Sequence, residues 1–186
     1  MSRNGTQMNW KGAFAPGMVG GRRAHPPKAD RVWDKKINVK ERRKAIRSAL
    51  AATIDKNVVT IRGHKVPTNY PFILESSVED IAKTQQVTEM LMKLKFDDEL
   101  ARAAVKKIRG GIGKTRGRPY QTRIGPLIVV SKACPLMKSA SNIAGIDVVD
   151  VSKLNASLLA PGTHAGRLTL YTEAALDRME KEELFR

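Results

Sequence analysis

Beyond an irregular N-terminal stretch, short apolar runs alternate with amphipathic segments along the chain. Within residues 40–54, apolar side chains such as Ile46, Ala49 and Leu50 recur at helical spacing, whereas most of the intervening positions are basic. Asn38 precedes this segment and can act as an N-cap. We therefore expect an amphipathic helix over residues 40–54.

Several runs of apolar and β-branched residues predict strands, because such residues pack well on a pleated sheet. The expected strands are 57–61 (NVVTI), 127–131 (LIVVS), 146–151 (IDVVDV) and 168–171 (LTLY). Further helical patterns cover 78–94, 97–108, 136–144, 155–160 and the segment after Thr172, and 67–77 is expected to be a loop. This alternation predicts an α/β fold in which a layered parallel sheet is flanked by helices.

Residues 1–36 lack apolar periodicity and are interrupted by many glycines and prolines. They also contain both tryptophans, Trp10 and Trp33. This composition predicts an extended basic arm that cannot build a core of its own. The expected organisation is an arm at 1–36 and an α/β domain at 37–186, with a basic insertion at 101–126.

The charge along the chain indicates a polyanionic partner. The net charge is +16 and the isoelectric point is near 10.3. Residues 101–146 contain ten basic residues and no acidic one, and such a run repels itself unless anions neutralise it. No apolar run reaches the roughly 18 residues of a membrane span, and the first residues do not resemble a signal peptide. We expect a cytosolic nucleic-acid-binding protein.

Motifs for catalysis or metal binding are weak. Residues 110–115 (GGIGKT) resemble the end of a phosphate-binding P-loop, but Ile108 stands where that motif needs glycine. Cys134 is the single cysteine, which excludes a disulfide framework, and the three histidines are too widely spaced for a zinc site. We expect no catalytic, cofactor or metal site. An α/β enzyme using Cys134 or the GGIGKT segment is the least favoured hypothesis.

Two segments combine arginine, glycine and ring-bearing residues: 20–27 (GGRRAHPP) and 109–123 (RGGIGKTRGRPYQTR). Arginine binds phosphate through two parallel donors, and Tyr120 could stack on an unpaired base. No zinc finger, basic zipper or helix-turn-helix pattern is recognisable. These loops suit irregularly folded RNA better than a regular duplex groove.

Five separated blocks of sequence resemble one known family in the same order. They are 20–28 (GGRRAHPPK), 40–53 (KERRKAIRSALAAT), 109–120 (RGGIGKTRGRPY), 131–145 (SKACPLMKSASNIAG) and 155–176 (NASLLAPGTHAGRLTLYTEAAL). They resemble the archaeal and eukaryotic form of the large-subunit ribosomal protein family number four. The lack of a long basic tail after Arg186 favours the archaeal form. Relative to that family, the chain begins inside the long loop, without the usual N-terminal strand, helix and ascending loop arm.

The resemblance implies a structural constituent of the large ribosomal subunit in the cytoplasm, without enzymatic activity or a cofactor. The implied partners are large-subunit (23S-type) rRNA, neighbouring ribosomal proteins and the nascent peptide in the exit tunnel, with no membrane. Together with the basic patches, it gives an expected set of rRNA-binding residues: Arg3, Lys11, Arg22, Arg23, His25, Lys28, Arg42, Arg43, Arg109, Lys114, Arg116, Arg118, Tyr120 and Arg123. The alternative is a nucleic-acid-binding regulator that acts outside the ribosome, for example on its own mRNA.

Overall fold

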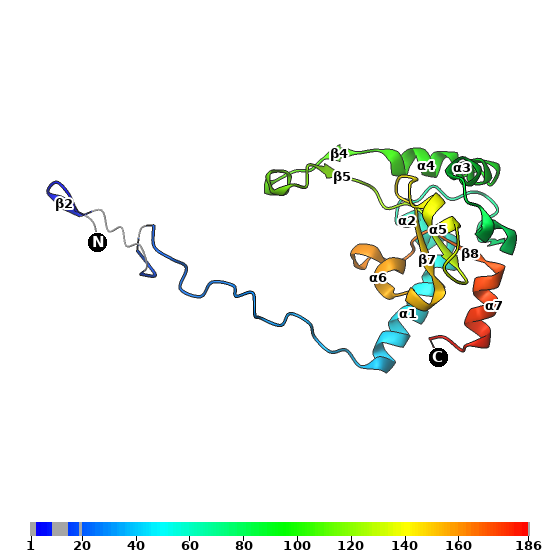
Figure 1. Cartoon of the computed structure of the whole chain (residues 1–186), viewed down its shortest axis with the longest axis horizontal. Helices are drawn as coiled ribbons and strands as arrows, with labels where there is room; N and C mark the ends of the chain where they lie inside the picture. Colours follow the sequence, from blue (N-terminus) through cyan, green and yellow to red (C-terminus); the bar gives the residue numbers. More distant parts are fainter. Residues whose placement is uncertain (1–2, 9–14, 19, 186) are drawn as a thin grey trace. The chain divides into compact units, whose positions relative to one another are not determined.

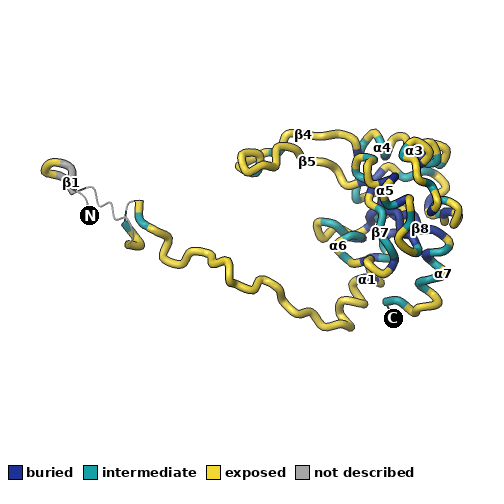
Figure 2. Tube along the Cα trace, viewed as in Figure 1, coloured by how far each residue is buried: buried dark blue, intermediate teal, exposed yellow. Residues whose placement is uncertain are grey.

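A computed structural model describes residues 3–8, 15–18 and 20–185. The chain consists of two compact units, residues 1–36 and residues 37–186. The first unit contains two short antiparallel strands, β1 (Arg3–Asn4) and β2 (Gln7–Met8). Residues 22–36 are exposed and form no helix or strand (Figure 2). Their assignment as an RNA-binding arm stays a prediction.

The second unit is built around a parallel four-stranded sheet, which confirms the expected α/β fold (Figure 1). Its strands, in spatial order, are β3 (Ile73–Leu74), β8 (Thr169–Thr172), β6 (Leu127–Val130) and β7 (Asp147–Asp150). All four residues of β6 are fully buried, as expected of a central parallel strand covered on both faces.

Helices cover both faces of the sheet. They are α1 (Val39–Ile54), α2 (Lys56–Ile61), α3 (Thr84–Lys93), α4 (Asp97–Ala104), α5 (Leu136–Ala140), α6 (Ala156–Leu159) and α7 (Glu173–Lys181). Alternate residues of β6 enter two cores: Ile128 packs with residues of α3 and α5, and Leu127 with residues of α1, α6 and α7. Helix α1 agrees with the expected segment to within one residue at its start, and Thr172 caps α7 by accepting from the Ala175 N–H.

The strand predicted at 57–61 is wrong, because these residues form α2. The Asp55 side chain caps this helix by accepting from the Asn57 N–H at 2.9 Å. The helix buries Val59 completely while Ile61 stays 85% exposed. Tertiary packing of one valine and a cap therefore override the β-propensity of the run.

Several other boundaries differ from the expectation; for example, the helix predicted at 136–144 ends at Ala140. The loop predicted at 67–77 contains the edge strand β3. The helix predicted at 78–94 begins only at Thr84, since Ser76–Asp80 form a 3-10 turn that directs the buried Glu79 carboxylate to Ser131 and Thr172. The helix predicted at 97–108 ends at Ala104, and its last two residues are a strand.

Candidate nucleic-acid interface

Within residues 101–126, the segment predicted as a basic insertion, residues 105–124 form a β-hairpin that projects from the second unit (Figure 1). Strand β4 (Lys107–Ile108) pairs antiparallel with β5 (Tyr120–Gln121), and a 3-10 turn at Ile112–Arg116 forms the tip. Gly111 and Gly117 flank this turn with φ values of 75° and 77°, which L side chains rarely adopt. The GGIGKT segment is therefore the tip of a hairpin and does not follow the strand–loop–helix order of a P-loop.

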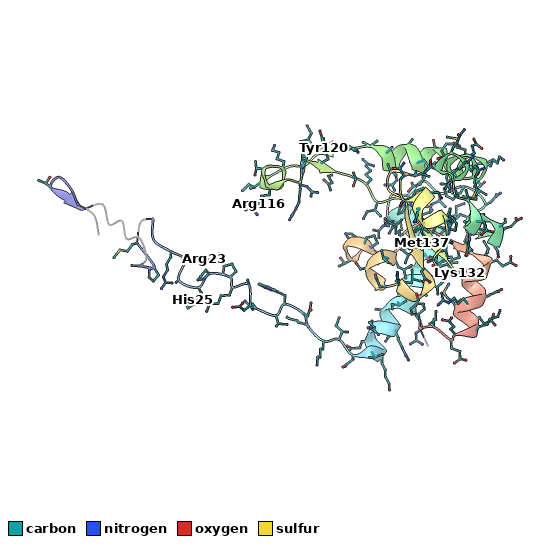
Figure 3. The ribbon with its side chains drawn as sticks, viewed as in Figure 1. Arg23, His25, Arg116, Tyr120, Lys132 and Met137 are labelled. Atoms are coloured by element: carbon teal, nitrogen blue, oxygen red, sulfur yellow. The ribbon has the colours of Figure 1, made fainter. Side chains whose placement is uncertain are left out.

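The hairpin is strongly cationic. Residues 105–124 contain seven Lys or Arg and no Asp or Glu. Lys114, Arg116 and Arg118 are exposed, and none of them forms an ion pair with a carboxylate in the part of the chain that the structure describes. Tyr120 is 57% exposed on β5 (Figure 3). These cations and the aromatic ring are thus available to an anionic partner.

Arg109 supports the shape of the hairpin. Its backbone N–H donates to the Pro119 carbonyl at 2.8 Å, and its guanidinium donates to the carbonyls of Arg118 and Tyr120 at 3.2 and 3.3 Å. Backbone carbonyls have no net charge, so these hydrogen bonds do not neutralise the guanidinium. Arg109 therefore bridges the two strands and still adds to the positive potential.

Two arginines outside the expected set anchor the base of the hairpin. Arg102 on α4 donates to the Ile124 carbonyl at 2.7 Å. Arg167, which is almost fully buried, donates to the Gly125 carbonyl at 3.0 Å and pairs with Asp147. The sequence offers one signal for Arg167, a charged residue directly before a buried strand, but none for Arg102.

Arg102 is itself held by a buried carboxylate. Both oxygens of Glu99 accept hydrogen bonds from the Arg102 guanidinium, at 2.6 and 2.8 Å. Burial opposes ionisation of Glu99, but hydrogen bonds from Arg102, His64 and the Lys65 N–H outweigh it and lower the pKa of Glu99 to about 2. Glu99 is therefore ionised at neutral pH and fixes the orientation of Arg102.

Close backbone packing also fixes the hairpin base, and a substitution there should destabilise the domain. A Cβ added at Gly125 would lie 2.7 Å from the Gly145 carbonyl oxygen, whereas one added at Gly110 in the hairpin meets nothing within 4 Å. We expect Gly125→Ala to lower the free energy of unfolding by about 1–3 kcal/mol, measured by urea denaturation. Gly110→Ala is the matched control and should change it by less than about 0.5 kcal/mol. Equal effects of the two substitutions would contradict the packing argument.

The other expected residues lie outside the hairpin. In the first unit, Arg22, His25 and Lys28 line one hollow of about 670 Å³, and Arg23 is exposed beside it (Figure 3). Arg31 lies over the ring of Trp33, with its guanidinium carbon 4.7 Å from the ring centroid.

Arg42 and Arg43 are exposed on the first turns of α1. Arg3 belongs to β1, but its side chain is not described, and Lys11 lies outside the described residues. The structure therefore brings together Arg22, His25 and Lys28 within the first unit. Separately, it gathers the hairpin residues within the second unit.

Within the described residues, no group of three metal-binding side chains is assembled, and no helix has the length and apolar character of a membrane span. Cys134 is partly buried, and burial raises the pKa of its thiol. A raised thiol pKa is the opposite of what a nucleophilic cysteine requires.

A small α/β domain that carries a cationic hairpin without carboxylates is typical of a nucleic-acid-binding protein. Comparison with known families agrees: residues 1–182 match the model of the Ribosomal protein L4/L1 family, and the chain belongs to that family. The chain is 46% identical over 172 residues to the large ribosomal subunit protein uL4 of Methanosphaera stadtmanae. It is 49% identical over 169 residues to the protein of the same name from Methanococcoides burtonii.

These alignments cover 91% and 90% of this chain but 66% and 67% of the two relatives. The chain thus spans about two thirds of the length of the curated relatives it matches. Family membership confirms the resemblance found in the sequence. The archaeal source of these relatives agrees with the expected archaeal form. The family is one of structural ribosomal components and not of enzymes, and its place is the large subunit of the cytoplasmic ribosome.

Proposed function

We propose that this chain is a structural constituent of the large ribosomal subunit that binds large-subunit rRNA through its hairpin and its N-terminal arm. The observation that supports this most directly is the set of exposed hairpin cations, Lys114, Arg116 and Arg118, which no carboxylate neutralises within the described residues. Phosphate groups of RNA are the abundant anions that would neutralise them.

The hairpin combines two modes of RNA recognition. Arginine guanidiniums contact phosphate oxygens through paired donors, which position a protein without reading sequence. Tyr120, exposed on the same hairpin, offers a ring on which an unpaired base can stack. We propose that the hairpin neutralises phosphates between rRNA helices and in this way helps the subunit to assemble.

The remaining contacts are assigned on the family resemblance and on exposure. The proposed set outside the hairpin is Arg3, Lys11, Arg22, Arg23, His25, Lys28, Arg42 and Arg43, and within it Arg109, Lys114, Arg116, Arg118, Tyr120 and Arg123. We further propose that the arm contacts the nascent peptide along the exit tunnel. A photo-crosslinker at the exposed Ala24 should then reach nascent chains in translating ribosomes. Crosslinks to rRNA alone would limit the arm to RNA binding.

Co-sedimentation tests the main proposal. The tagged chain, expressed in a methanogen, should sediment with large subunits and stay with them after a moderate salt wash. Recovery in free complexes with its own mRNA would instead support a regulator outside the ribosome. Recovery as free protein without RNA would contradict both functions.

A further inference from the structure

A cleft lies where the hairpin joins the domain, and none of the residues proposed above except Arg123 belongs to it. The cleft has a volume of about 820 Å³ and is bordered by the end of α2, by α4, by the base of both hairpin strands and by the loop before β8. All of these segments belong to the second unit, so the cleft is part of a single folded body.

Four cationic side chains surround the cleft, and none of its twelve lining residues is acidic. They are Arg62, Arg102, Lys107 and Arg123. Glu99 lies behind the wall and neutralises Arg102. In the described part of the chain, no carboxylate pairs with Arg62, Lys107 or Arg123. Three uncompensated charges therefore remain around one hollow.

Arg62 is fixed in place for this role. Its guanidinium donates to the Pro161 carbonyl at 2.7 Å and to the Ala165 carbonyl at 3.4 Å. Burial lowers the pKa of Arg62, and the charges of Arg167 and Arg102 lower it further. An anion in the cleft would relieve this repulsion, and the fixed side chain would lose little conformational entropy on binding it.

Part of the cleft lining is apolar, which a bare phosphate would not require. Val58, Ile61 and Ile124 contribute this surface, and the last two are 85% and 42% exposed. The exposed side chains of Gln121 and Thr122 add hydrogen-bonding groups to the lining. Together, the cations, the apolar side chains and the few polar groups match the phosphate, the base face and the base edge of a nucleotide.

We propose that the cleft holds one unpaired nucleotide of RNA, its phosphate on Arg62, Lys107 and Arg123 and its base against Ile61 and Ile124. An unpaired nucleotide is favoured over a duplex because stacked base pairs cannot present a base face to a hollow. The inference rests on the proposed rRNA binding and specifies what the cleft recognises in that RNA, which is a base extruded from its helix.

Two RNA probes test the assignment: a stem with one bulged adenosine, and the same stem fully paired. The full chain should bind the bulged stem about tenfold more tightly, because packing the extruded base against Ile61 and Ile124 removes apolar surface from water. The cleft variant carries Ile61→Ser, Lys107→Gln and Arg123→Gln, all at exposed positions, so that folding is preserved. It should lose this preference. The tip variant Lys114→Gln, Arg116→Gln and Arg118→Gln removes more charge, but it should weaken both complexes equally and keep the tenfold ratio.

The outcomes separate this inference from the proposed function. If large-subunit rRNA binds but the wild-type chain does not prefer the bulged stem, the cleft assignment is wrong and rRNA binding stands. Binding of AMP without any preference for the bulge would assign the cleft to a free nucleotide and overturn the proposal. Absence of binding to any RNA, whole rRNA included, would overturn the proposed function itself.

Discussion

Replacing Lys114, Arg116 and Arg118 by glutamine should flatten the salt dependence of rRNA binding by about two to three units of log Kd against log salt. Each phosphate contact releases condensed counterions and contributes about 0.7 to this slope on single strands and 0.9 on a duplex. The three side chains are exposed on the hairpin, so each can reach a different phosphate. Filter binding to large-subunit rRNA over a range of salt concentrations measures the slope.

A charge-matched control distinguishes a defined surface from general attraction. Lys83, Lys93 and Lys138 are exposed at α3 and α5, away from the hairpin, and their replacement by glutamine removes the same charge. We expect this control to change the slope by less than one unit. Equal flattening by both triple variants would show that rRNA senses only net charge, and it would contradict the hairpin interface. Both variants should fold, since exposed substitutions change stability by less than about 0.5 kcal/mol each.

The sequence predicted the parts of the fold that depend on long apolar patterns. The LIVVS run became one of the two central strands because burial on both faces requires continuous apolar residues, and the stripe of α1 is visible at helical spacing. The NVVTI run misled because the burial of Val59 and the Asp55 cap outweigh the β-propensity of its branched residues, and neither effect is visible in the run itself. The two-residue strand β4 escaped prediction because it is too short to show a period.

The candidate site was predictable in composition but not in geometry. A run of cations without acids indicates an anionic partner, and this drew attention to 109–123, whose binding of RNA stays a prediction. Sequence does not say whether an arginine is exposed or buried. Arg102 therefore carries no visible mark of its role at the hairpin base, and Arg167 is marked only by its place directly before a buried strand. The cleft joins Arg62 to Lys107 and Arg123, which are distant in sequence, so only the fold brings them together.

Glu99 makes the second prediction with a large effect, on stability at acid pH. Its carboxylate is fully buried, and it accepts from His64 Nδ1 at 2.6 Å and from the Lys65 N–H at 2.8 Å, besides the two bonds from Arg102. Because the pKa of Glu99 is lowered from 4.5 to about 2 in the folded state, the unfolded chain binds this proton first as the pH falls. The contribution of Glu99 is therefore complete above about pH 5 and is lost towards pH 2.

The lowered pKa of Glu99 contributes about 3 kcal/mol to the free energy of unfolding at neutral pH, since one unit of pKa shift corresponds to roughly 1.4 kcal/mol. Glu99→Gln cannot titrate, and its amide sets a donor against the donors of His64 and Arg102. We expect the variant to be about 3–5 kcal/mol less stable at pH 7, as for other broken buried ion pairs. Urea denaturation of both proteins from pH 7 to pH 2 should show this difference shrinking by about 3 kcal/mol below pH 5. Other carboxylates, such as Glu79, titrate in both proteins and cancel in the difference.

Asp98→Asn, at an exposed position in the same turn of α4, is the control for Glu99→Gln and should leave the pH profile close to that of the wild type. A difference between wild type and Glu99→Gln that stays constant from pH 7 to pH 2 would mean that the pKa of Glu99 is the same in the folded and unfolded states, which would contradict the lowered pKa. The Glu99→Gln variant also removes the carboxylate that holds Arg102, and so weakens the hydrogen bond from Arg102 to the Ile124 carbonyl. Its rRNA affinity at pH 7 should therefore fall even where the domain remains folded, because the hairpin loses an anchor to α4.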